Sequence, residues 1–265
     1  MKELETFIAS LGIGLSLGFM GAGGSILTIP VFVYVLKKDP LSSGVYSMFV
    51  VGMSSMAGTV QSIFNKLVDF KVAITFGLPS IVGVLLARKL IYPLIPEQLF
   101  SLGAYSVSKS MLFMLCLSSL MFVSAFRMLK PAVSKNNERQ EFDNPATVLL
   151  LLRGLMVGTI TGLLGIGGGF LIVPALYFLA RLPVKTAIGT ALVIITINSM
   201  FSFLTSYGSM DLDWFLLAKF SLGAIIGIII GTRLSQRIPG AYVKKIFGWF
   251  VLSISLYIVY KEFFP

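Results

Sequence analysis

The stretch GLLGIGGGFLIVP (162–174) contains five glycines in an otherwise apolar segment, and GFMGAGGSILTIP (18–30) repeats its pattern. The two stretches align without a gap at a spacing of 144 residues, which matches Gly18 with Gly162. Each glycine in a helix interior costs about 1 kcal/mol relative to alanine, so this density predicts a broken backbone rather than a continuous helix. Because the pattern occurs twice, the chain is predicted to contain two structural repeats.

The composition predicts an integral membrane protein. Hydrophobic residues make up 56% of the 265 residues, charged residues 12%, and the mean hydropathy is +0.93. Several apolar runs exceed the ~20 residues that cross a bilayer, and they are continuous rather than alternating, which favours an all-α bundle over a β-barrel. We expect eight hydrophobic segments, at 5–36, 42–64, 70–95, 98–127, 146–180, 185–207, 213–236 and 241–260.

A polar stretch divides these segments into two groups of four. KPAVSKNNERQEFDNP (130–145) has proline near both ends and reads as a linker. The expected organisation is therefore a first transmembrane repeat at 1–129, the linker at 130–145 and a second transmembrane repeat at 146–265. Asp69 matches Asp213 at the same spacing of 144 residues. Two repeats of this kind are typical of secondary transporters.

The basic residues indicate topology. The formal charge is +10, but lysine and arginine lie mostly between apolar runs and form no long basic stripe, so we expect no nucleic-acid partner. If all eight segments cross the membrane, ten basic residues face nine across it, which is no bias. If the first segment of each half is re-entrant, thirteen face six, as the positive-inside rule expects. The second arrangement also inverts one half relative to the other.

The glycine motifs have two readings. Glycines in membrane helices often allow close packing of neighbouring helices. Three consecutive glycines do not share one helical face, however, and broken backbone at membrane depth must be covered by protein or by a watery cavity. Helices that restart at Ser25 and Gly169 would present free N–H groups to an anion in that cavity. The candidate substrate-binding residues of these motifs are Gly23, Gly24, Ser25, Gly167, Gly168 and Gly169.

A small, polar stripe on the second segment of each half supplies further candidates. Ser54 and Asn198 are matched by the repeat near the middle of their segments, and we prefer them as substrate contacts. The alternative is hydrogen bonding between helices. Lys109 is the basic residue nearest the middle of an apolar segment, so it either contacts the substrate or extends toward the nearer membrane surface.

Several chemistries lack their usual residues. Histidine is absent, and one cysteine excludes an internal disulfide and a multi-cysteine metal site. No carboxylate lies well inside any apolar segment, so neither a proton relay nor a cation site is apparent. We therefore expect no catalytic activity, no metal and no cofactor, and we expect electrogenic uniport of an anion.

The two GxGGxxxxP motifs, at the heads of duplicated four-segment halves, resemble those of the TauE/SafE (TSUP) family. IGTALVIITINS (188–199) and SYGSMDLDW (206–214) add to the resemblance. It implies a multi-pass transporter in the inner (plasma) membrane of a bacterium or archaeon that exports sulfite, thiosulfate, sulfoacetate or a related sulfonate. Transport of another small anion or carboxylate, and import of the same class, stay open as alternatives, and a cation carrier is disfavoured. The sequence allows either a monomer or a homo-oligomer.

Overall fold

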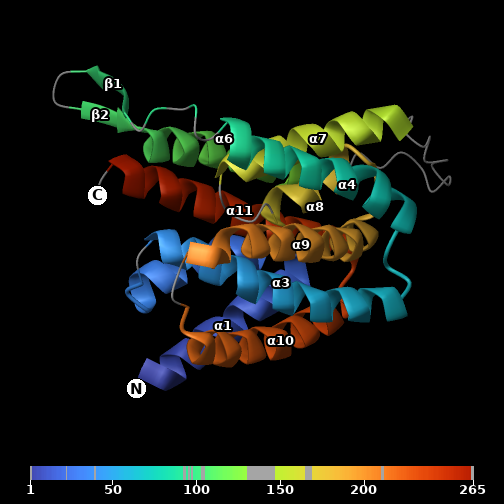
Figure 1. The fold of residues 1–265 in the computed structure, drawn as a ribbon. Helices are drawn as coiled ribbons and strands as arrows, with labels where there is room; N and C mark the ends of the chain where they lie inside the picture. The colour runs from blue at the N-terminus through green and yellow to red at the C-terminus, as the bar shows by residue number, and fades with distance from the viewer. Residues whose placement is uncertain are drawn as a thin grey trace.

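The computed structural model is a bundle of helices (Figure 1). It describes residues 2–21, 23–38, 40–91, 94, 96, 98–102, 105–129, 147–164, 169–209 and 212–263. Five described helices are long and apolar enough to cross a membrane: Ser42–Phe64, Phe70–Ile91, Val184–Ser206, Trp214–Arg237 and Gly240–Tyr260. Large hydrophobic side chains are exposed along these helices, as expected for a surface that contacts lipid.

The chain forms its elements in two series. The first comprises α1 (Lys2–Met20), α2 (Gly23–Pro30), the π-helix η1 (Val31–Val35), α3 (Pro40–Phe64), α4 (Phe70–Leu86), the π-helix η2 (Ala87–Ile91), β1 (Gln98–Leu102), β2 (Tyr105–Ser108) and α6 (Lys109–Leu129). The second comprises α7 (Thr147–Leu164), α8 (Gly169–Phe178), α9 (Val184–Ser206), the 3-10 helix η3 (Tyr207–Ser209), α10 (Trp214–Arg237) and α11 (Gly240–Phe263).

The first helix of each series packs on a helix of the other series. The backbone of Gly14 in α1 lies directly against the carbonyl of Ala224 in α10, and that of Gly158 in α7 lies against the carbonyl of Ser80 in α4. Gly14 and Gly158 are 144 residues apart, as are Ser80 and Ala224. The same close contact therefore occurs twice, and in both places the missing side chain lets two helix backbones meet.

The centre of the bundle is the pair α3 and α9. Thr59 in α3 lies beside Thr196 in α9, with 3.2 Å between their hydroxyl oxygens, whereas the earlier Gly52 lies beside the later Met200. The pairing thus runs in opposite directions along the two helices, which are antiparallel. These two helices, which occupy matching places in the two series, therefore point in opposite directions.

The predicted break in the first segment lies at Gly21. This residue has a φ of 74°, a conformation that favours glycine, and it separates α1 from α2. A Cβ at Gly24 would lie 2.6 Å from the carbonyl oxygen of Ile13 and 2.7 Å from Cβ of Leu17, so α2 folds back along α1. In the second series, α7 ends at Leu164 and α8 begins at Gly169, and residues 165–168 lie outside the described part of the chain.

The segment expected at 98–127 is not one helix. Its first part forms an antiparallel hairpin in which Phe100 pairs with Val107, and α6 begins only at Lys109. The YSVS stretch (105–108) alternates apolar residues with serine, a period-two pattern typical of strands that the overall hydropathy of the segment conceals. The expectation that Lys109 lies deep inside a helix was therefore wrong.

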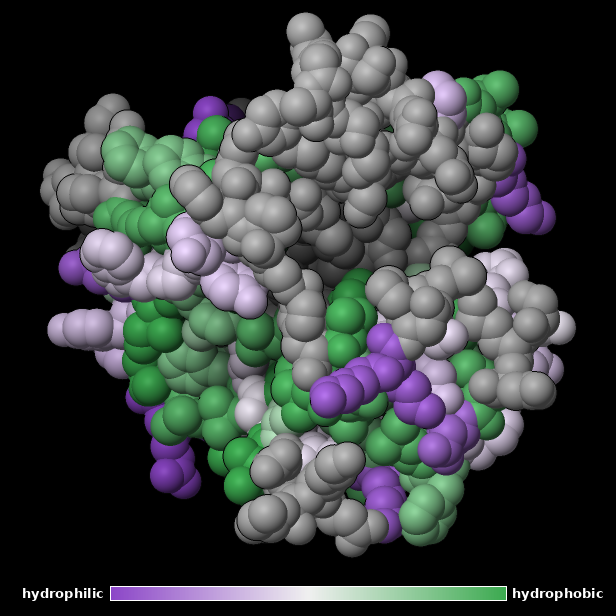
Figure 2. Space-filling view, turned by 90° about the vertical axis from the view of Figure 1, so that its left-hand side faces the viewer, coloured by the Kyte–Doolittle hydropathy of each residue, from purple (hydrophilic) through white to green (hydrophobic). Residues whose placement is uncertain are grey.

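Both termini lie at the same end of the bundle, on the left of Figure 1. Figure 2 looks onto this end and shows hydrophilic side chains between apolar ones. Such a mixture is expected where helices leave the hydrocarbon layer and meet the aqueous phase.

Candidate substrate site

Polar side chains meet where α3 and α9 cross. The hydroxyl oxygen of Thr196 lies 3.0 Å from Oγ of Ser55 and 3.2 Å from Oγ1 of Thr59, and it also lies 2.7 Å from the carbonyl oxygen of Leu192. Polar side chains bonded in this way hold membrane helices together without leaving a donor or acceptor unpaired. This cluster explains part of the predicted polar stripe as contact between helices.

Asn198 differs from these residues because one of its polar atoms has no partner. It is 2% exposed, and its Nδ2 donates to Oγ of Ser80 in α4 at 3.2 Å. Its Oδ1 is buried without a hydrogen bond to any described residue, and so is Oγ of the neighbouring Ser199. An unsatisfied buried polar group costs about 1–3 kcal/mol, so each of these atoms indicates a place where a ligand or water completes the bonding.

The Asn198 amide can present either a donor or an acceptor. The Ser80 hydroxyl donates as readily as it accepts, so a 180° rotation of the amide preserves their hydrogen bond. After rotation the free position carries an NH₂ group instead of an oxygen. Asn198 can therefore supply an N–H donor and Ser199 an O–H donor, both from α9, while the Ser80 proton is used in its bond to Asn198.

Ser54, the repeat mate of Asn198, is bonded within its own helix. It is fully buried, and its Oγ donates to the carbonyl of Val50 at 2.6 Å, with that of Val51 at 3.3 Å. Its hydroxyl proton is thus already used. The predicted pair is asymmetric, with an unpaired polar atom on Asn198 alone.

The glycines of the motifs serve two purposes in the described residues. Gly18 packs closely on Ile228 and Gly162 on Val84, so these two allow helices to approach, as the packing interpretation holds. Gly21 and Gly24 instead permit the turn and the return of α2. A Cβ at Gly21 would meet side chains of Ile188 and Val173, which brings the first break close to α8 and α9.

The remaining predicted site residues are described in part or not at all. Gly23 and Ser25 lie in the first turn of α2, and Gly169 is the first residue of α8. Gly167, Gly168 and the side chains of Ser25 and Lys109 lie outside the part that the structure describes. Among the described contacts, none joins the glycine breaks directly to Asn198, so the breaks and the polar centre are two neighbouring parts of the candidate site.

Two further hydrogen bonds that the sequence reasoning missed connect the series, and we call them the two clasps. The N–H of Asp69 donates to Oγ1 of Thr190 at 3.0 Å, and the N–H of Asp213 donates to the hydroxyl of Tyr46 at 2.6 Å. Each aspartate also caps a helix with its carboxylate. Asp69 accepts a hydrogen bond from Val72 N–H in α4, and Asp213 accepts one from Leu216 N–H in α10, both at 3.0 Å. The two donor residues, Asp69 and Asp213, are 144 residues apart, and so are the two acceptor residues, Tyr46 and Thr190. Because α3 and α9 are antiparallel, the clasps lie at opposite ends of this helix pair.

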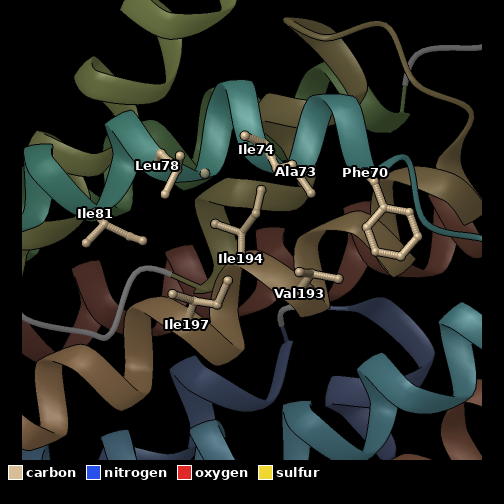
Figure 3. Close-up of a pocket in the computed structure, with 9 residues that line it drawn as sticks. Phe70, Ala73, Ile74, Leu78, Ile81, Val193, Ile194 and Ile197 are labelled. Carbon is tan, nitrogen blue, oxygen red and sulfur yellow. The ribbon is translucent and has the colours of Figure 1, made fainter.

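An apolar groove lies between α4 and α9, outside the polar centre (Figure 3). Its volume is about 250 Å³, and it is lined by Phe70, Ala73, Ile74, Gly77, Leu78, Ile81, Val193, Ile194 and Ile197. We call it the α4–α9 groove. With no charged or hydrogen-bonding side chain in its lining, it does not suit a small anion. Within the described residues there is also no group of three His, Cys, Asp or Glu side chains that could hold a metal ion.

Helices of membrane-spanning length, an apolar surface and a buried polar centre define a multi-pass integral membrane protein. The model of the family "Sulfite exporter TauE/SafE" matches residues 6–258. The chain belongs to this family and is a membrane transporter rather than an enzyme.

Curated relatives agree with this assignment. A probable membrane transporter protein of Xylella fastidiosa (strain 9a5c) is 28% identical over 272 residues, which cover 98% of this chain and 97% of the relative. The probable membrane transporter protein YunE of Bacillus subtilis is 24% identical over 278 residues, covering 98% and 99% of the two chains. The probable membrane transporter protein MJ0441 of Methanocaldococcus jannaschii is 35% identical over 118 residues, 41% of this chain and 43% of its own. No solved structure was found to match.

Proposed function

We propose that the protein exports a small sulfur-containing anion, such as sulfite, thiosulfate, sulfoacetate or a related sulfonate, through the inner membrane by alternating access. The description of the family supports the substrate class and the direction. The observation that carries the proposal is the buried, unpaired amide atom of Asn198 in the middle of a membrane-spanning helix. A polar atom in this position is costly unless a ligand uses it.

The donors available here suit an oxyanion. Sulfite and sulfonate oxygens accept hydrogen bonds, and the rotated Asn198 amide and the hydroxyl of Ser199 offer neutral donors. The first turns of α2 and α8 add backbone N–H groups and the positive ends of helix dipoles, and the break before α2 lies against Ile188 of α9. The described spans contain no Asp or Glu between their ends, so no carboxylate repels an anion.

Alternating access is supported by the relation between the two halves. The opposite directions of α3 and α9, and the recurrence of contacts at 144 residues, are the features of inverted repeats that rock around a central site. In this mechanism each clasp closes one end of the site. Opening one end breaks the Asp69–Thr190 bond and leaves Asp213–Tyr46 intact, and opening the other does the reverse.

Cysteine labelling tests the proposed topology. Lys37 and Arg181 are exposed, 144 residues apart and alike in backbone, with φ of 52° and 55°. Because Cys116 is exposed, the single cysteines Lys37→Cys and Arg181→Cys are placed in a Cys116→Ala background. In intact cells, a membrane-impermeant maleimide should label the cysteine at 37 and reach the one at 181 only after permeabilisation. Labelling of both from the outside contradicts the inverted arrangement.

The membrane potential is the proposed driving force. An interior negative by 100 mV favours exit of a monovalent anion by about 2.3 kcal/mol, enough for a roughly fiftyfold gradient, and exit of a divalent anion by twice that energy. In proteoliposomes we expect sulfite or thiosulfate flux to follow an imposed potassium-diffusion potential without any pH gradient. Flux that needs a proton or sodium gradient at zero potential contradicts uniport, and equal flux of acetate contradicts the substrate class.

A further inference from the structure

The α4–α9 groove is open, whereas two equivalent positions in the other half of the chain carry aromatic side chains that pack together. At a spacing of 144 residues, Val193 corresponds to Phe49 and Phe70 to Trp214. Phe49 and Trp214 pack edge to face with ring centroids 5.9 Å apart, and Phe203 lies 6.3 Å from the same tryptophan ring. Aromatic side chains can thus pack at these positions in this architecture. In the α4–α9 groove the smaller Val193 and Phe70 stand in their place and leave the groove open.

The groove has the surroundings of a lipid chain. Phe70, Ile74, Leu78 and Ile197 line it and are also exposed, so it opens on the apolar outer surface of two helices of membrane-spanning length (Figure 3). From Phe70 to Ile81 it follows twelve residues of α4, about 16 Å along the helix axis. A space of this length, shape and polarity suits a hydrocarbon chain rather than a polar solute.

Two exposed lysines lie at one end of the groove. Lys71 follows Phe70 directly, and Lys66 lies in the connection between α3 and α4, next to Leu67, whose carbonyl packs against Gly189 of α9. Asp69, between them, uses its carboxylate to cap α4. The equivalent positions in the other half are Met210 and Phe215, so the cations and the open groove occur together in one half of the chain.

We infer that the α4–α9 groove binds one acyl chain of an anionic phospholipid whose phosphate lies beside Lys66 and Lys71. The floor of the groove is the contact between Gly77 and Ile194, where a Cβ would lie 3.2 Å from Cγ1 of Ile194. The Asn198–Ser80 hydrogen bond joins the same two helices. A lipid that fills the groove therefore stabilises the α4–α9 arrangement on which the polar centre depends, whatever the transported solute is.

Thermal unfolding of the purified full chain in detergent tests this inference. Phosphatidylglycerol is titrated against phosphatidylcholine with the same acyl chains, because a ligand that binds only the folded state raises the unfolding temperature. We expect saturable stabilisation by phosphatidylglycerol and a weaker effect of phosphatidylcholine. Each lysine near a lipid phosphate contributes about fivefold in affinity, so Lys66→Gln with Lys71→Gln should weaken the apparent affinity for phosphatidylglycerol about twenty-fivefold.

Two variants separate the groove from general lipid effects. Lys245→Gln removes an exposed lysine at the start of α11, at the same end of the bundle, and should keep the lipid preference. Val193→Phe introduces the residue found at the equivalent position in the other half, and it should abolish the lipid response while the unfolding temperature without lipid stays the same or rises. Equal stabilisation by both lipids, or an unchanged lipid response in Val193→Phe, overturns the inference.

Discussion

Gly14→Ala is expected to destabilise the protein by about 3 kcal/mol or more, because the new methyl group meets the carbonyl of Ala224 in the neighbouring helix. Both partners are helix backbone, which cannot move aside as a side chain can, so α1 and α10 must separate along their contact. The loss should appear as a marked fall in the thermal unfolding temperature of the detergent-purified protein.

Gly12→Ala is the matched control, two residues away in the same helix. A Cβ at Gly12 meets nothing within 4 Å, so alanine should stabilise α1 by up to about 1 kcal/mol through its helix propensity. Gly158→Ala should reproduce the loss in the other half, because Gly158 meets the carbonyl of Ser80. If alanine at positions 12, 14 and 158 has the same effect, helix propensity rather than backbone contact governs these sites.

Asn198→Ala is expected to lower substrate affinity by at least tenfold and to cost about 1–3 kcal/mol of folding stability, because it also leaves the buried Ser80 hydroxyl without its partner. A hydrogen bond to a charged group contributes about 1.5–3 kcal/mol, and the substitution removes the amide position that has no partner within the bundle and that carries an N–H donor once the amide is rotated. Binding of sulfite and thiosulfate to the purified protein, measured by calorimetry, gives the affinities directly.

Asn65→Ala provides the comparison for this variant. Asn65 is exposed at the end of α3, where its amide donates to the carbonyl of Gln61 at 2.7 Å. The Asn65→Ala variant should bind substrate with the same affinity as the unmodified chain. Unchanged affinity in Asn198→Ala would assign the unpaired amide to water and remove the main support for an anion site between α4 and α9.

The break at Gly21 and the multi-helical membrane fold could be predicted because they depend on local chemistry. A run of glycines weakens any helix, and long apolar runs have few alternatives to crossing a bilayer. The match of Asp69 with Asp213 was also visible, since aspartate is a strong helix cap in either half. These features repeat in the sequence for the same reason that they repeat in space.

The clasps and the position of Lys109 could not be predicted in the same way. The hydroxyls of Tyr46 and Thr190 each accept a hydrogen bond from an aspartate N–H, but the two side chains differ. A comparison of residue types between the two halves therefore does not match these positions. Lys109 was placed by hydropathy averaged over 98–127, which does not distinguish an apolar hairpin from an apolar helix. Whether a glycine breaks a helix or packs on a neighbour, as for Gly21 and Gly18, depends on partners about 150–210 residues away in the chain.

Because the first helix of each half packs on a helix of the other half, the contacts also set an order of folding. The surface of α1 that carries Gly14 and Gly18 has its partner in α10, roughly 210 residues later in the chain. At 5–20 residues per second, synthesis of that stretch takes about 10–40 s. During this time α1 lacks its partner α10, whereas α4 receives its partner α7 much sooner. Assembly therefore begins in the middle of the chain and ends by joining its two outer parts.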